Sequence, residues 1–329
     1  MRWGAFAGRR TRRFASLVAT ALLLCGCGGR SPATPSPVVA SPPPDPTVMF
    51  TGRVTATNGQ QPLANVKASF GPAITATTDS TGTFTMRFLP GTTSQLMLEG
   101  DTIVPRALVA SVSRTRVLDV DAIQQGGGFD LKFYRQLVRD DLDSPGLLRP
   151  LRRWIQAPDV YLRTVDDVGS EIDPATLDLT EAAIRESVAL WTGGLFGVRT
   201  LERGTDSREG VAGWITVKWS SSKEYRYCGF ADVAVSGGMI ELYAKTGCRC
   251  VGGPQIGPGV IRHEVGHAMG FFHTDSQTDS MWHQDVNCNQ TPSARELYHA
   301  RIAYARPIGN RDPDQDPTSM VHVAPMRIP

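Results

Sequence analysis

Residues 263–273 read HEVGHAMGFFH, which is an H-E-x-x-H-x-x-G-x-x-H pattern. The chain has 329 residues and six histidines, three of which lie in this stretch, and none precedes it. An ordinary amphipathic helix with satisfied histidines is the alternative interpretation. That alternative does not explain why a glutamate, a glycine and a third histidine accompany the pair at these spacings, so we expect a metal site.

The spacing itself predicts how the metal ligands come together. Positions four apart share one face of a helix, so His263 and His267 can offer imidazole nitrogens to one ion. Gly270 tolerates a positive φ, which is the usual way to end a helix and turn the chain. The turn brings His273 back as a third ligand. Three protein ligands leave a fourth position for water, which is typical of a catalytic Zn²⁺ site.

Glu264 follows the first histidine directly and is expected beside the metal rather than on it. Bound zinc lowers the pKa of water to roughly 7 and polarises a carbonyl group. Glu264 would then take a proton from the water as general base and return it to the leaving amine. The stretch therefore predicts hydrolysis with one Zn²⁺ ion as cofactor.

Eight residues after His273 stands Met281, within the sequence Ser280-Met281-Trp282-His283. The eleven-residue motif followed by a methionine turn resembles the metzincin superfamily of zinc endopeptidases, and the spacing is most similar to its matrixin branch. The resemblance implies that Met281 lies in a tight turn beneath the metal. It also implies the same zinc ligands and the same base, which are His263, His267, His273 and Glu264.

The chain departs at three places from the metzincin pattern that it resembles. Astacin-like members carry a tyrosine two residues after the turn methionine, where this chain has His283. This histidine is a candidate for a transition-state contact, with an ordinary surface histidine as the alternative. No upstream histidine exists for the second, structural zinc of matrixins, and residues 28–227 contain no cysteine for a cysteine switch. The sequence therefore leaves latency control open.

Residues 1–27 are expected to be a targeting segment. Arginines precede a short apolar run from Phe14 to Leu24, and Cys25-Gly26-Cys27 follow it directly. This pattern resembles a bacterial lipoprotein signal with Cys27 as the lipidated residue, and a plain secretory signal is the alternative. It predicts a lipid-anchored protein of the cell envelope, with Gly28 favouring the outer membrane. Residues 28–47, rich in Pro and Ser, predict an extended tether.

Four cysteines remain in the exported part of the chain. Export permits disulfides, so two bridges are expected, with three possible pairings and a second metal site as the rival interpretation. These four residues are Cys228, Cys248, Cys250 and Cys288. The net charge of +2, with acidic and basic residues in balance, gives no indication of nucleic-acid binding. We also expect a monomer.

Residues 48–123 consist of short alternating segments between turn signals such as Asn58-Gly59, which predicts a small all-β sandwich. Residues 52–54, 62–66, 78–84 and 89–91 together resemble carboxypeptidase regulatory-like, transthyretin-like domains. The resemblance implies a role as spacer, adhesive module or folding aid. A linker and helical connection are expected over residues 124–153.

Residues 154–309 predict an α+β domain in the metzincin order of elements. Asp178 and Glu181 suggest the start of a long helix, and Ser293 with Glu296 caps a final one. The resemblance to metzincins implies that an extended substrate pairs with an edge strand, for which the stretch Phe230 to Ser236 is the candidate. The fold class is thus multidomain, a small all-β sandwich followed by an α+β metzincin-like protease domain.

Residues 310–329 are expected to form a tail. Its acidic stretch, Asp312 to Pro317, suggests calcium, but it lacks the glycine of an EF-hand loop and contains prolines. We therefore expect a solvated acidic tail, and calcium stays without support.

Together these features favour a zinc endopeptidase that binds a peptide or protein substrate in extended form. Two alternatives remain open. One is a zinc hydrolase of another bond, such as an ester or a cell-wall peptide, because the same zinc and glutamate could serve either reaction. The other is an envelope adhesion or scaffold protein with an inactive protease domain, although Glu264 and all three histidines are intact.

Overall fold

The computed structural model describes residues 47–329 apart from 90, 112–116, 222–226, 244–255, 285–287, 320 and 322–323. The expected signal segment with Cys27, the tether up to residue 46, and Cys248 and Cys250 lie outside the described residues. Within the described part of the chain, every helix is too short or too polar to cross a membrane.

The N-terminal region is built from two small sheets, in which every strand pair except β1 with β7 is antiparallel. One has the strand order β4-β1-β7 and the other the order β3-β2-β5-β6. The strands are β1 (Val48–Ala56), β2 (Lys67–Phe70), β3 (Ile74–Thr77), β4 (Thr83–Phe88), β5 (Thr93–Glu99), β6 (Arg106–Ser111) and β7 (Leu118–Ala122). The expected all-β region is confirmed, and β3 is a strand that the sequence pattern did not predict.

Alternating burial explains why these strands form a sandwich. In β1 nearly every second residue is buried, so one face of the strand points inward. Four phenylalanines from both sheets meet between them in edge-to-face or tilted contacts, with ring centroids 4.7 to 6.1 Å apart. They are Phe50, Phe70, Phe84 and Phe88. One apolar core therefore joins the two sheets.

The C-terminal region contains a six-stranded sheet in the order β13-β11-β12-β10-β8-β9. The strands are β8 (Asp159–Asp166), β9 (Leu201–Gly204), β10 (Trp214–Ser220), β11 (Gly229–Asp232), β12 (Gly238–Tyr243) and β13 (Arg327–Ile328). The helices are α1 (Leu131–Arg139), α2 (Pro174–Trp191), α3 (Pro258–Met269) and α4 (Ala294–Tyr304). This is the expected α+β region.

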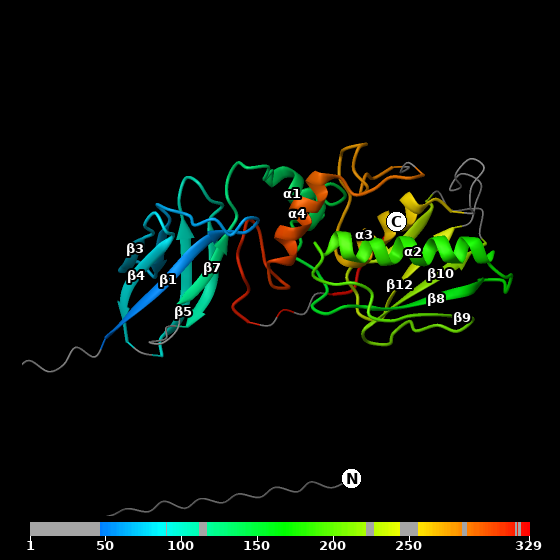
Figure 1. Cartoon of the computed structure of the whole chain (residues 1–329), viewed down its shortest axis with the longest axis horizontal. Helices are drawn as coiled ribbons and strands as arrows, with labels where there is room; N and C mark the ends of the chain where they lie inside the picture. Colours follow the sequence, from blue (N-terminus) through cyan, green and yellow to red (C-terminus); the bar gives the residue numbers. More distant parts are fainter. Residues whose placement is uncertain are drawn as a thin grey trace, which may run out of the picture. The chain divides into compact units, whose positions relative to one another are not determined.

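The sheet is parallel from β9 to β12, and β11 then runs antiparallel to β12. The central strand β10 is buried along nearly its whole length, as expected for a strand covered on both faces. Helices α2 and α3 lie together along the sheet (Figure 1). Their contact is fixed by Trp191, whose indole nitrogen donates to the carbonyl of Arg262 at 3.1 Å.

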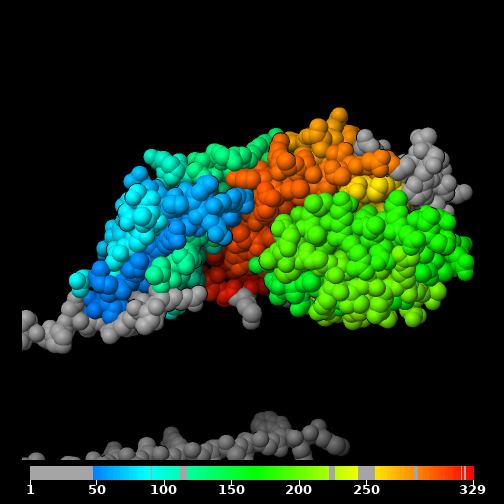
Figure 2. Space-filling model, viewed as in Figure 1, coloured from blue at the N-terminus to red at the C-terminus, as the bar shows by residue number. Residues whose placement is uncertain are grey.

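Helix α3 is the most buried of the four helices. Ten of its twelve residues are buried. On the face drawn in Figure 2, little of the yellow segment that contains α3 reaches the surface. Polar side chains on this helix are therefore held away from bulk water, which sets the chemistry of the site described below.

The predicted start of the long helix α2 is wrong. The helix begins at Pro174, and its N-cap is Asp173, whose carboxylate accepts from the backbone nitrogen of Thr176 at 3.0 Å. Proline suits the first helical position because its missing N–H would be unpaired there anyway. Asp178 and Glu181 lie inside the helix instead and pair with Arg203.

The predicted solvated acidic tail is also wrong. Asp314 is fully buried and pairs with Arg306, whose Nε donates to Oδ1 at 2.6 Å. Asp312 pairs with Arg135 at 2.7 Å and Asp316 with Arg106 at 3.0 Å. All three carboxylates are thus engaged by guanidinium groups.

Candidate metal centre

The site is built on the end of α3, where the chain turns. Gly270 forms the C-cap with a φ of 113°, and its backbone N–H donates to the carbonyls of Gly266 and His267. A Cβ atom at this position would lie 2.4 Å from the carbonyl oxygen of Arg152. Both the left-handed conformation and the lack of space require glycine here. The turn brings Phe271, Phe272 and His273 back over the helix, as the sequence predicts.

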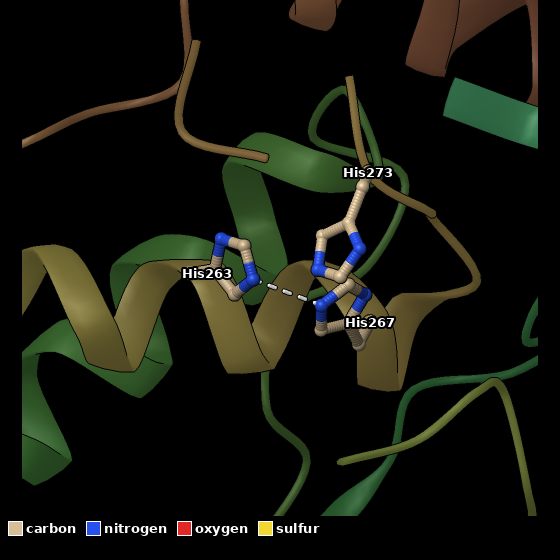
Figure 3. A group of neighbouring side chains, drawn as sticks. All are labelled: His263, His267 and His273. Carbon is tan, nitrogen blue, oxygen red and sulfur yellow. Dashed lines mark hydrogen bonds between the residues drawn. The ribbon is translucent and has the colours of Figure 1, made fainter. Parts of the chain in front are cut away.

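The turn gathers three buried imidazole rings (Figure 3). His263, His267 and His273 each offer a ligand atom within 4.8 Å of the others. The Nε2 atoms of His263 and His267 are 2.9 Å apart. For comparison, two nitrogens bound to one tetrahedral zinc at 2.0–2.1 Å are about 3.3 Å apart.

The outer nitrogen of every ring is already engaged. Nδ1 of His263 lies 2.6 Å from the carbonyl oxygen of Ser280, and Nδ1 of His267 lies 2.8 Å from that of Phe271. Nδ1 of His273 lies 2.6 Å from a carboxylate oxygen of Asp143. Because each Nδ1 faces an acceptor, it carries the proton, and each Nε2 keeps its lone pair for the common point. Converging lone pairs repel one another unless a cation lies between them.

Burial also keeps the rings in the neutral form that a metal ligand requires. Desolvation, together with the neighbouring His273, lowers the pKa of His263 to about 3. Desolvation likewise holds the pKa of His267 well below its usual value. The donor set of three neutral imidazoles therefore fits Zn²⁺.

Glu264 lies on the same helix and is 2 % exposed. Its Oε2 atom is buried without a hydrogen-bond partner among the described residues, and burial raises the pKa of its carboxyl group. Gly229 of β11 makes room for this group, because a Cβ atom there would lie 2.5 Å from Oε1. A buried carboxyl group with an unused oxygen, next to three converging imidazoles, fits a site made to hold a metal ion and water.

Met281 is fully buried and its side chain lies against α3. A Cβ atom on Gly266 would lie 2.4 Å from its sulfur, so the glycine allows the methionine to approach the helix. Glu296 at the start of α4 accepts from the backbone nitrogens of Ser280 and Met281 at 2.9 and 2.8 Å. The expected capping box of Ser293 and Glu296 is confirmed, and the same glutamate also holds the methionine turn.

One comparison with known families decides what this arrangement is. The family model described as Astacin, a family of peptidases, matches residues 221–305. The matched stretch contains the whole of α3, the three histidines, Met281 and α4. This stretch is similar to the astacin family of peptidases. The protein therefore carries a zinc metalloendopeptidase domain with a three-histidine zinc site.

The match confirms the metzincin superfamily expected from the sequence, but it favours a different branch. The spacing of Met281 favoured the matrixins, whereas the family model that matches is that of the astacins. Both belong to the pattern of three histidines followed by a methionine turn.

Other comparisons add little. A search of curated proteins finds no match. A type II cohesin–X-dockerin complex from Acetivibrio cellulolyticus, a C-terminal interface mutant, is 20 % identical over 25 % of this chain and 60 % of that chain, with a TM-score of 0.19. The N-terminal interface mutant of this complex is 22 % identical over 23 % of this chain and 52 % of that chain, with a TM-score of 0.17. This chain thus spans less than two thirds of either, and such low scores do not establish a shared fold.

Three predicted site residues lie outside the buried histidine cluster. His283 is exposed, and its Nδ1 lies 3.2 Å from the carbonyl oxygen of Thr274. Of the four candidate cysteines, Cys228 and Cys288 are described, and both are disulfide-bonded. Their pairing is not defined by the described residues, because Cys248 and Cys250 lie outside them.

Asp143 is a site residue that sequence reasoning missed. It lies in the segment after α1, 130 residues before His273 in the chain. No local pattern marks it, since an aspartate between helix and turn residues is common. Only the fold brings this carboxylate to the third ligand, where it fixes the tautomer and orientation of the ring.

Proposed function

We propose that the peptidase domain cleaves peptide bonds in extended chains with Glu264 as its general base. The observation that carries the proposal is the buried Oε2 of Glu264, which has no partner among the described residues and lies on the same helix as two of the three converging histidines. Such a group costs stability unless a ligand or water uses it. We further propose that Met281 forms the apolar floor of the site.

The histidines His263, His267 and His273 would hold the zinc ion through Nε2. When bound, zinc supplies Lewis acidity, which acidifies a water molecule and polarises the substrate carbonyl. Glu264 removes a proton from the water as its oxygen bonds to the carbonyl carbon. The same carboxyl group then gives that proton to the amine nitrogen as the C–N bond breaks. Its burial keeps this carboxyl group away from bulk water, so the proton is held within the site between the two transfers.

The substrate in this proposal is an extended peptide that runs along the edge of β11. This strand is antiparallel to β12, and its first residue, Gly229, lies against the carboxyl group of Glu264. A peptide that pairs with such an edge gains main-chain hydrogen bonds and presents its carbonyl groups to the site. The proposed edge is thus shorter than the stretch Phe230 to Ser236 and begins one residue earlier.

The test compares the wild type with Glu264→Gln, which keeps the shape of the side chain but cannot accept the proton. Both proteins, loaded with zinc, are incubated with a diverse peptide library, and new termini are identified by mass spectrometry. We expect cleavage by the wild type and a loss of at least about 10²-fold in the variant, with zinc content unchanged. Equal cleavage by both proteins would contradict the role of Glu264.

We also propose that Cys27 is lipidated and anchors the protein in the cell envelope, with the tether separating it from the membrane. The disulfide-bonded state of Cys228 and Cys288 supports an oxidising compartment outside the cytosol, and two bridges in all are proposed. Membrane fractionation of the wild type and of Cys27→Ser tests this. Release of the variant alone supports the anchor, and identical fractions argue against it.

The remaining proposals concern the rest of the chain. We propose that residues 48–123 are a carboxypeptidase regulatory-like domain that acts as a spacer, and that the protein is a monomer. The apolar core between its two sheets supports a β-sandwich domain. For His283 we propose a contact with the substrate, which its exposure beside the turn permits.

A further inference from the structure

The short strand β13 occupies the edge of the peptidase sheet. It pairs antiparallel with β11, with Ile328 opposite Ala231 and Arg327 opposite Asp232. The pairing extends one residue further, because the backbone nitrogen of Val233 donates to the carbonyl of Met326 at 2.7 Å. Residues 326–329 therefore take the place of an added strand along β11, which we call the tail strand.

Side-chain contacts hold the tail strand in place in addition to its backbone hydrogen bonds. Ile328 is 7 % exposed and packs with Val233 and Phe272 in a small separate apolar cluster. Phe272 directly precedes the ligand His273, so this cluster borders the metal centre. The tail strand thus buries an aliphatic side chain next to the site.

An ion pair fixes the register of the tail strand. Nε and Nη2 of Arg327 donate to the two carboxylate oxygens of Asp232 at 2.8 and 3.2 Å. Asp232 is itself positioned, because its Oδ2 accepts from the backbone nitrogen of Met239 at 3.0 Å. A two-pronged contact of this kind selects a guanidinium group in a defined place.

The tail strand reaches the metal centre. The backbone of Pro329, which follows the paired residues, comes within hydrogen-bonding reach of the ring of His267. Because β11 itself begins at Gly229 beside Glu264, the direction of the tail strand carries it from Val233 toward the catalytic groups. A substrate peptide paired with the same edge would meet the same atoms.

We infer that residues 326–329 occupy part of the substrate groove as an internal competitor, and that Asp232 is a specificity residue that selects a basic side chain in the bound peptide. The inference rests on the proposed function, since it places the substrate on the edge of β11. A tethered segment acts at a high effective concentration, so even weak pairing competes with free substrate.

The first test uses the full chain loaded with zinc and compares the wild type with Ile328→Asp. A charge cannot stay in the apolar cluster, so the tail strand should leave the groove. We expect KM for a peptide substrate to fall about tenfold with kcat unchanged, and hydrogen exchange over residues 326–329 to accelerate. The same change at the exposed Leu195, which is 57 % exposed, serves as the matched control and should alter neither.

Unchanged KM in Ile328→Asp, together with accelerated exchange over residues 326–329, would overturn the inference, because the tail strand would have left without freeing the groove. If hydrogen exchange over residues 326–329 is unchanged in Ile328→Asp, the charge reversal Arg327→Asp is used instead, and it must lower KM if the inference holds.

The role of Asp232 is tested separately. Asp232→Asn in the Ile328→Asp background should lose about two- to fivefold in kcat/KM only for peptides with a basic residue at the matching position. Equal loss for all peptides would exclude Asp232 as a specificity residue.

Binding separates this inference from the proposed function. A labelled peptide with the sequence of residues 324–329 is titrated onto zinc-loaded Ile328→Asp, in which its own segment is displaced. Binding there, and weaker binding to the wild type, supports the competitor even if no hydrolysis is found. Equal binding to both proteins, or none to either, rejects it whatever the outcome of the cleavage test.

Discussion

The N-terminal sheets and the ligand helix solve the problem of burial in opposite ways. Between the two N-terminal sheets the buried side chains are mostly apolar, and four phenylalanines fill the space. On α3 the buried set includes His263, Glu264 and His267, all of which prefer water. A fold retains buried polar groups, despite their energetic cost, where they act together in function. The polar burial on α3 therefore marks the functional site, whereas the apolar burial between the N-terminal sheets serves stability.

The largest expected effect comes from removing a ligand. In His267→Ala the zinc site keeps two imidazoles, and we expect loss of stoichiometric zinc together with at least about 10³-fold loss of peptidase activity. Zinc content by mass spectrometry and cleavage of a peptide substrate check this. Phe271→Leu, a change nearby that leaves the ligands in place, is the control. Retention of zinc and activity by His267→Ala would show that the buried polar residues of α3 do not form the metal site.

Removing a core phenylalanine should act on stability instead. Phe50 is 1 % exposed and touches the other three phenylalanines, so Phe50→Ala should cost about 3–5 kcal/mol of unfolding free energy in the N-terminal region. Denaturant unfolding measures the cost, and zinc content per folded molecule should stay the same. A loss of zinc without a loss of stability would show that the two regions do not divide the roles in this way.

Acid should weaken the polar contact that joins the two regions. Burial alone would raise the pKa of Asp121, but the cations of Arg306 and Arg106 hold it at about 2. A depressed pKa stabilises the fold above the unfolded value of 3.8 and loses that contribution as pH falls through about 2. Stability should therefore fall by about 1.8 kcal/mol between pH 4 and pH 2 on account of this group.

Unfolding of Asp121→Asn over the same pH range supplies the control for the acid prediction. The variant has no carboxyl group to titrate at this position, so its pH dependence should be shallower by that amount. Curves of equal slope for the variant and the wild type would show that the pair with Arg306 and Arg106 does not contribute.

The smallest expected effect concerns Asp143. Without its carboxylate, the ring of His273 loses the partner that orients it, so Asp143→Ala should weaken zinc affinity about 10- to 100-fold. Competition with a fluorescent zinc chelator measures this affinity directly. Asp141→Ala, in the same segment, is the matched control and should bind zinc like the wild type. Unchanged affinity in Asp143→Ala would remove this residue from the metal centre.

The sequence predicted what depends on near neighbours in the chain. The ligand helix, the glycine that ends it and the capping box of Ser293 all follow from spacing over a few residues, and the structure contains each of them. The true start of α2 was within reach too, because Asp173 followed by Pro174 is a recognisable helix start. The pattern of Asp178 and Glu181 obscured it.

Contacts across long stretches of chain could not be predicted in this way. Asp143 meets His273 across 130 residues, and Arg106 meets Asp316 across 210. The two-residue strand β13 is too short to carry a pattern, and its pairing with β11 depends on where the chain returns. Asp314 looked solvated because charge alone does not say which arginine will be folded onto it.

The most direct test of the account is a zinc titration of the purified protein. Zinc is removed with a chelator, and peptide cleavage is followed as Zn²⁺ is added back in known amounts. We expect no cleavage by the zinc-free protein and full recovery at about one zinc ion per chain, as a single three-histidine site requires. Cleavage that persists without zinc, or recovery that needs two ions, would contradict the assignment of His263, His267 and His273 as the catalytic metal centre.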